Sequence, residues 1–253
     1  MEINKTSLVF CLNILLWVAF ACQSSNAYNK NKQKNQQSSF VVDTTAESKV
    51  LPKPQFCQKM ENLGLVEIQT VEPNIRVFVP YGTTENFTHT ELYDTYQYAY
   101  FQPDVALMLQ QAYHYLQEEK TGSTFLIWDG ARPLSVQKKM WTIACQMDKK
   151  CYVSNPKNTG LHNYGAAVDL TLVDSLGNKL DMGTDFDFFG EAAHTDKEQV
   201  LLDKGILTTQ QVANRQLLRR VMKKAGFSVL PTEWWHFNAC SRRVAKQKYQ
   251  LID

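Results

Sequence analysis

The order of helical and strand segments is the feature that most restricts the fold of this chain of 253 residues. Apolar residues recur with helical spacing over three segments, 103–120, 133–147 and 208–224. Short runs of strand-forming residues lie at 124–128, 166–173, 228–230 and 234–238, with a hairpin turn expected at 176–178. Because helices and strands do not alternate regularly, the pattern predicts an α+β fold with a mainly antiparallel sheet and flanking helices.

The first residues form a separate unit. Lys5 precedes an apolar run, Ser7 to Ala21, which is shorter than the about 20 residues of a membrane span but suits a signal peptide. Its end resembles a bacterial lipobox with Cys22 as the lipidated residue, while Ser25-Asn26-Ala27 suits plain cleavage after export. We therefore expect residues 1–22 to be a signal peptide or a lipoprotein signal. The protein would be exported to the periplasm or cell envelope, with Cys22 as one means of membrane attachment.

Composition separates a linker from the folded part. Residues 23–50 are rich in Gln, Asn, Ser and Lys and lack the apolar content needed to offset the entropy of ordering, so they predict a disordered linker. Residues 51–253 are expected to form one domain. The formal net charge is +2, and the surplus falls in the linker. A domain without excess positive charge is not expected to bind nucleic acid, and the sequence implies no protein partner.

The chain has six cysteines. Cys11 and Cys22 belong to the signal segment, and the folded part keeps Cys57, Cys145, Cys151 and Cys240. Since an exported protein meets an oxidising environment, two disulfides are expected. Four cysteines allow three connectivities, among which a bond between the close neighbours Cys145 and Cys151 is favoured. A zinc site built from all four cysteines is disfavoured because no C-x2-C pair is present.

Two segments carry residues with the chemistry of a metal site. His162 precedes the expected strand at 166–173, and Asp169 lies within it. Gly165 between them permits a tight turn. His236 lies in the last expected strand, and two imidazoles and a carboxylate are all good zinc ligands. Three protein ligands leave a fourth position open, as in catalytic zinc sites.

Two further residues give this site hydrolytic chemistry. Glu233 lies three residues before His236 and can face the same site across a bend, where a carboxylate accepts the proton of attacking water. Arg132 follows the strand at 124–128, and a guanidinium there can stabilise an oxyanion. Each residue alone has an ordinary structural explanation, such as a turn at Asp129-Gly130. Only their combination indicates a hydrolase.

Five short elements follow one another along the chain: Tyr81–Thr88, Trp128–Pro133, His162–Thr171, Met182–Asp187 and Glu233–His236. In sequence and order they resemble the motifs of the D-alanyl-D-alanine dipeptidases, the VanX-type zinc peptidases. The resemblance covers most of the folded part. It implies the fold of that family, whose zinc site is shared with hedgehog-type domains.

The resemblance also implies roles for individual residues. One zinc ion per chain would be bound by His162, Asp169 and His236. Glu233 would be the general base and acid, and Arg132 would stabilise the tetrahedral intermediate. The domain at 51–253 would then be a zinc peptidase.

The substrate's amine end is where this chain departs from the family. The resemblance implies that Asp187 and Tyr81 hold the free ammonium of a small dipeptide. Gly160, however, stands where some members have a serine that assists in binding the amine. Ala131 replaces a tyrosine before the arginine, and Tyr164 stands where some members have arginine. These departures leave strictness for D-Ala-D-Ala open.

The expected function is hydrolysis of D-alanyl-D-alanine to two D-alanines in the turnover of cell-wall fragments. A D,D- or L,D-carboxypeptidase acting on peptidoglycan is an alternative, which Asp187 and Tyr81 disfavour because they suit a free amine. A non-catalytic zinc module that binds cell wall is an alternative of another class. It would need neither Glu233 nor Arg132.

Overall fold

The computed structural model describes residues 52–253. The expected signal segment and linker lie outside this part. The helices are α1 Gln55–Asn62, α2 Ile68–Val71, α3 Pro103–Glu119, α4 Leu134–Gln146, α5 Glu198–Asp203, α6 Thr209–Lys224 and α7 Arg242–Lys248. The strands are β1 Val66–Glu67, β2 Arg76–Val77, β3 Tyr100–Phe101, β4 Thr124–Asp129, β5 Ala167–Val173, β6 Ser228–Leu230 and β7 Glu233–Asn238. None of these helices has the length and hydropathy needed to cross a membrane.

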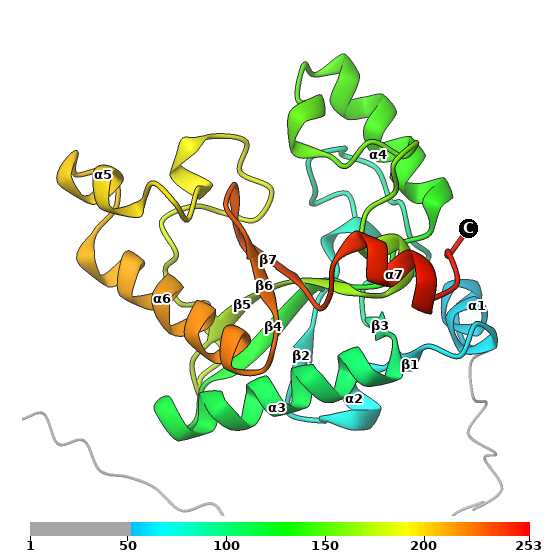
Figure 1. Ribbon diagram of the computed structural model, residues 1–253, viewed down its shortest axis with the longest axis horizontal. Helices are drawn as coiled ribbons and strands as arrows, with labels where there is room; N and C mark the ends of the chain where they lie inside the picture. The colour runs from blue at the N-terminus through cyan, green and yellow to red at the C-terminus, as the bar shows by residue number, and fades with distance from the viewer. Residues whose placement is uncertain (1–51) are drawn as a thin grey trace, which may run out of the picture. The chain divides into compact units, whose positions relative to one another are not determined.

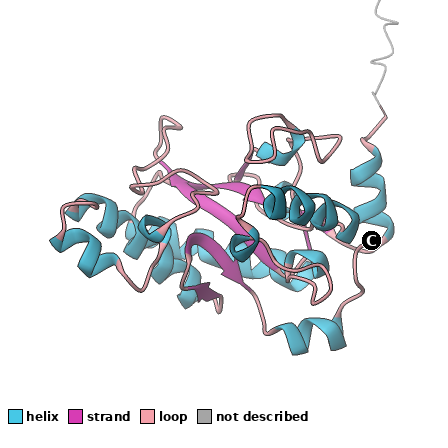
Figure 2. Ribbon diagram, turned by 90° about the horizontal axis from the view of Figure 1, so that it is seen from above, coloured by secondary structure: helices cyan, strands magenta, loops and turns pink. Residues whose placement is uncertain are grey.

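The principal sheet has the strand order β2-β4-β5-β7-β6. The β2 and β4 strands run parallel, whereas β4–β5, β5–β7 and β6–β7 are antiparallel pairs. A separate antiparallel pair joins β1 to β3. Figure 2 shows the strands among helices, and in Figure 1 the long helices α3 and α6 lie together on one side of the sheet. The expected α+β class is confirmed.

The central strand β5 is buried along its whole length. Its apolar side chains pack with those of β4 and of helices α3 and α6 in one core, which includes Leu109, Phe125, Val168, Leu170 and Leu218. Asp169 is the exception on this strand, because it is charged and yet only 3% exposed. A buried carboxylate is costly unless partners compensate its charge, so the fold itself points to Asp169 as a site residue.

Helix α6 holds the loop that leads from the sheet to α5. The helix begins with a capping box in which Thr208 and Gln211 exchange hydrogen bonds. The buried Arg215 on this helix donates from Nε to the carbonyl of Met182 (2.6 Å) and from Nη2 to that of Ala192 (2.9 Å). One side chain therefore ties both ends of the segment 182–192 to the helix.

The expected elements agree closely with the structure. The three helical segments correspond to α3, α4 and α6, and the four strand segments to β4, β5, β6 and β7. The expected hairpin turn is present, with Gly177 at φ +91° and Val173 bridged to Lys179. The short elements α1, α2, α5, α7 and β1 to β3 were not anticipated.

The expectation of two disulfides is wrong for this structure. Cys57, Cys145 and Cys240 are free thiols. Cys57 is buried in a small cluster with Met60, whereas Cys240 packs against the main core. The apolar contacts that bury these thiols place them in different parts of the domain. The side chain of Cys151 lies outside the described part of the chain.

Replacing Arg215 tests how the loop 182–192 is held. Arg215→Met removes the side-chain donors from the carbonyl oxygens of Met182 and Ala192, so we expect the free energy of unfolding to fall by about 3 kcal/mol in urea denaturation. Arg220→Met on the same helix is the matched control. Its exposed pair with Glu119 should contribute less than about 1 kcal/mol. Equal losses in the two variants would contradict this role of Arg215.

Candidate active site

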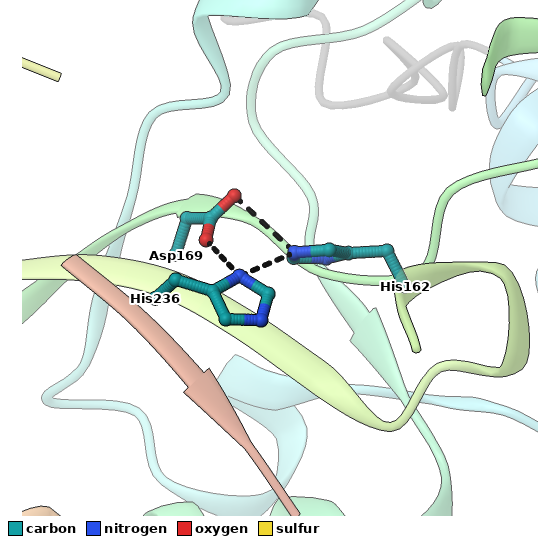
Figure 3. Close-up of side chains that lie close together, drawn as sticks. All are labelled: His162, Asp169 and His236. Atoms are coloured by element: carbon teal, nitrogen blue, oxygen red, sulfur yellow. Dashed lines mark hydrogen bonds and ion pairs between the residues drawn. The ribbon is translucent and has the colours of Figure 1, made fainter. Parts of the chain in front are cut away.

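Three side chains converge where β5 and β7 lie side by side (Figure 3). Asp169 on β5 and His236 on β7 are cross-strand partners, and His162 lies in the short 3₁₀ helix His162–Tyr164 just before β5. His162 Nε2 lies 3.2 Å from His236 Nδ1 and 3.3 Å from Asp169 Oδ2. His236 Nδ1 lies 2.9 Å from Asp169 Oδ1. The sequence-predicted ligand set is therefore assembled in space.

Neighbouring groups determine which ring nitrogens carry protons. His162 Nδ1 lies 2.8 Å from the carbonyl oxygen of Gly130, which can only accept, so this nitrogen donates. His236 Nε2 in turn donates to Asn238 Oδ1 at 2.8 Å. In the neutral form of each ring, the other nitrogen would present a lone pair toward the Asp169 carboxylate. Such outer hydrogen bonds are typical of metal-binding histidines.

The three ligand atoms face one another closely enough for a single positive ion to contact all of them. Two nitrogen lone pairs and a carboxylate oxygen, all within 4.8 Å of one another, repel unless something positive lies among them. A proton can bridge only one of the three contacts, whereas a divalent cation would satisfy all three. His162, Asp169 and His236 therefore fit a divalent metal ion.

Asp169 is prepared for this role by its surroundings. Burial by itself would raise the pKa of the carboxyl group. In the absence of a metal, protons carried by the facing His162 and His236 outweigh burial and hold that pKa well below its usual range, and a bound cation would favour the carboxylate in the same way. Asp169 therefore stays ionised, as a metal ligand must.

The Gly165 turn positions His162 relative to the strand. Gly165 has φ +65°, and its N–H donates to the carbonyl of His162 at 3.0 Å. A Cβ there would lie 2.7 Å from a methyl carbon of Leu65. The left-handed backbone favours glycine, and any larger residue would also have to displace the Leu65 side chain. The expected turn is confirmed.

Arg132 is held rigidly beside the metal ligands. Its guanidinium donates from both Nε and Nη2 to Asp129 Oδ2, and from Nη1 to Gln137 Oε1 at 2.9 Å. Nη2 also lies 3.7 Å from Asp169 Oδ2. With 7% of its surface exposed, Arg132 presents a preorganised positive edge to the cavity.

Sequence reasoning missed the residues that orient Arg132. Asp129 was interpreted as part of a turn, yet it is the buried last residue of β4 and also accepts from the Tyr93 hydroxyl at 3.2 Å. The signal available in the sequence was an acidic residue three positions before the arginine. Gln137 lies within α4, and no motif marked it.

Tyr81 and Asp187 lie 106 positions apart in sequence but meet in the fold. The Tyr81 hydroxyl donates to Asp187 Oδ2 at 2.7 Å. Asp187 belongs to the loop held by Arg215, and burial raises its pKa to about 7. The pair is an acidic site poised to gain a positively charged partner.

Glu233 reaches the same cavity because the β6–β7 ladder is irregular. On a regular strand, Glu233 and His236 would point to opposite faces, being an odd number of residues apart. The register shift between Val229 and Leu230 inserts extra residues into β7, and both side chains line one cavity. Burial raises the pKa of Glu233 to about 7.

All seven residues singled out from the sequence line a single cavity of about 140 Å³. They are Tyr81, Arg132, His162, Asp169, Asp187, Glu233 and His236. This volume lies below the roughly 300–1,000 Å³ of pockets for drug-sized molecules, so it suits a small ligand.

Comparison with known proteins agrees with this geometry. Residues 61–252 match the family model described as D-ala-D-ala dipeptidase, peptidase M15. The chain belongs to the D-ala-D-ala dipeptidase family. It is therefore a hydrolase of the peptidase class. The D-alanyl-D-alanine dipeptidase of Escherichia coli K12 is 30% identical over 173 residues, covering 68% of this chain and 83% of that protein.

Two enterococcal proteins show the same relationship. The D-alanyl-D-alanine dipeptidase of Enterococcus faecalis V583 is 30% identical over 196 residues, covering 70% of this chain and 92% of the relative. That of Enterococcus faecium is 26% identical over 195 residues, covering 69% and 91%. Each match spans nearly the whole relative, so the shared part is a complete domain of those proteins.

The departures from the family pattern have clear places in the structure. Ala131 is buried in a cluster with Tyr100, and Tyr164 is buried with its hydroxyl 3.2 Å from Thr159 Oγ1. Gly160 lines the cavity, and a Cβ there would lie 3.3 Å from Ser154 Oγ, which lines it too. A hydroxyl is therefore present next to Gly160, although it comes from a different position in the chain.

Asn238→Ala tests the outer hydrogen bond of His236. Losing this acceptor frees the ring orientation, so we expect affinity for a divalent metal to fall about 10- to 100-fold, with zinc as the probe in competition with a chromogenic chelator. Asn158→Ala, in an exposed loop, is the control and should leave affinity unchanged. Equal affinities in both variants would show that Asn238 does not orient the ligand.

Proposed function

We propose that this chain is a zinc-dependent dipeptidase that hydrolyses D-alanyl-D-alanine to two D-alanines. The observation that carries the proposal is the Tyr81–Asp187 pair in the same small cavity as the candidate metal ligands, Arg132 and Glu233. An acidic pair at this place favours a substrate whose free ammonium lies close to the scissile bond. The names of the relatives support the same substrate.

Zinc is the proposed metal because two imidazoles and one carboxylate form a typical catalytic zinc set, leaving a position open. When bound, zinc supplies Lewis acidity, which makes water a stronger acid and the scissile carbonyl a better electrophile. His162, Asp169 and His236 would hold one such ion per chain.

Glu233 and Arg132 would carry the remaining chemistry. A carboxylate with its pKa raised to about 7 by burial can accept a proton from attacking water and return it to the leaving amine at neutral pH. The guanidinium of Arg132, fixed by Asp129, would stabilise the negative charge that develops on the carbonyl oxygen.

Asp187 and Tyr81 would set the specificity for a dipeptide. An ionised Asp187 pairs with the substrate ammonium, while Tyr81 keeps the carboxylate oriented. An N-acylated substrate has no charge to offer and would leave this carboxylate unpaired, which is costly in a buried site. A longer peptide would meet the same penalty, which disfavours the carboxypeptidase alternative.

The proposed setting is the cell envelope, where released wall fragments would be recycled. This part rests on the apolar run at 7–21, which resembles an export signal. Fractionation of cells that produce the full chain would place the protein with the envelope. Recovery from the cytoplasm alone would contradict export.

Three substrates test the assignment. Purified protein loaded with zinc should hydrolyse D-Ala-D-Ala, with little turnover of L-Ala-L-Ala and of N-acetyl-D-Ala-D-Ala. Release of free alanine is the measurement. Equal turnover of all three would be incompatible with a dipeptidase that needs a free amine.

Glu233→Gln tests the proton carrier. The amide cannot take a proton, so kcat should fall by about 10²–10⁴-fold while the bound zinc is retained. Zinc content by elemental analysis and kcat by alanine release give the two readouts. Undiminished kcat would mean that another residue is the base.

The pH dependence isolates Asp187. Above pH 7 its carboxyl is ionised and pairs with the ammonium, so Asp187→Asn should lower kcat/KM about 100-fold there. Below pH 7 the wild-type carboxyl becomes protonated and neutral, so the difference between wild type and variant should narrow. Asp185→Asn, two residues away and exposed, is the control. A difference that stays constant from pH 8 to pH 5.5 would contradict this role.

A further inference from the structure

A zwitterionic dipeptide brings a carboxylate into the cavity as well as an ammonium. Asp187 and Tyr81 would account for the ammonium, and Arg132 for the scissile carbonyl. Two residues in an extended chain span at most about 7 Å, so the carboxylate must also lie within or at the rim of the same small cavity. Its recognition requires a positive or hydrogen-bond-donating group there.

Arg132 is already committed to other groups. Its Nε and Nη2 donate to Asp129 and its Nη1 to Gln137, so its charge is compensated by Asp129 and its position is fixed. The edge of the guanidinium that faces Asp169 is the one proposed to stabilise the oxyanion. A second anion on Arg132 would compete with its role in catalysis.

Arg242 is the other arginine that lines the cavity. It is the first residue of α7, which follows β7 within a few residues (Figure 1). It is exposed and, among the described residues, has no carboxylate or hydrogen-bond partner for its side chain. Its neighbour Arg243 is also exposed but donates to Gln247 at 3.3 Å on the same helix.

The place of Arg242 on its helix gives it no stabilising role. A positive charge in the first turn opposes the helix dipole, which favours acidic residues there, and α7 has none. Within residues 52–253, Arg242 is thus an unpaired cation that destabilises its own helix and lies at the wall of a ligand cavity. It is available to bind an anion.

The charges of the cavity lead to the same residue. Asp129 compensates Arg132, the proposed zinc ion compensates Asp169 and an ionised Glu233, and the substrate ammonium compensates Asp187. The substrate carboxylate is then the one charge without a partner, and Arg242 is the one lining cation without a partner in the described part of the chain.

We propose that Arg242 binds the terminal carboxylate of the dipeptide and thereby restricts the enzyme to substrates that end at the second residue. The inference rests on the proposed dipeptidase function. Asp187 would bind the ammonium at one end of the dipeptide, and Arg242 would bind the carboxylate at the other end. A substrate whose carboxylate is masked loses the second contact only.

The test compares D-Ala-D-Ala with its C-terminal amide in the wild type and in Arg242→Gln. For D-Ala-D-Ala, we expect KM to rise about tenfold with kcat nearly unchanged, because a contact made equally in the bound substrate and the transition state is lost. For the amide, KM should be the same in both proteins. Arg243→Gln, the neighbouring exposed arginine, should behave as wild type with both substrates.

Two results would overturn the inference, and they are distinguishable. If wild type hydrolyses D-Ala-D-Ala but Arg242→Gln changes the acid and the amide equally, Arg242 does not bind the carboxylate, and the dipeptidase function stands. If zinc-loaded wild type hydrolyses no dipeptide, the proposed function fails and the inference fails with it. Matching thermal unfolding midpoints for the three proteins exclude misfolding as the cause.

Discussion

The site depends on the mutual repulsion of three acceptor groups held at short distance. The outer nitrogens of His162 and His236 lie within hydrogen-bond distance of Gly130 O and Asn238 Oδ1, so that in the neutral rings both inner nitrogens would be lone pairs facing Asp169. The pairing of β7 with the buried strand β5 holds this arrangement together. Packing of the core thus holds a charged carboxylate and two nitrogen lone pairs at distances where they repel one another. A bound cation would remove this repulsion.

Other charged side chains of the cavity are also fixed in position by neighbouring protein groups before a ligand binds. Arg132 is fixed by Asp129 on the strand next to β5, and Asp187 is fixed by Tyr81 on a loop that Arg215 ties to α6. In the proposed function, Arg132 would act at the reacting carbonyl and Asp187 at the substrate's amine. Because these groups need little reorganisation on binding, the cavity is suited to catalysis on a small, highly charged molecule.

Local patterns predicted the long elements and the ligand types. Helices such as α3 and α6 have clear apolar periodicity, and β5 is a continuous strand-forming run around Asp169, so the sequence was sufficient for them. The two-residue strands and the short helices α2 and α5 were missed because they depend on tertiary contacts rather than on local propensity.

Spatial relations were the harder part of the site. The meeting of Tyr81 with Asp187 came from the family resemblance, since no local rule links residues so far apart in the chain. The contact of Asp129 with Arg132 was not expected because Asp129-Gly130 resembles a turn. The place of Arg242 at the cavity, on which its proposed role rests, was not expected because it looks like an ordinary surface charge. The expected disulfides fail for a related reason, because spacing along the chain does not show that Cys57 and Cys240 are packed in separate clusters.

The central claim is that His162, Asp169 and His236 form a metal site, and the metal content of the purified chain tests it most directly. Elemental analysis of protein prepared without chelators should give one zinc ion per chain, removed by a chelator and restored to the same stoichiometry by added zinc. A chain that contains no divalent metal, and takes up none at millimolar zinc, would contradict the account.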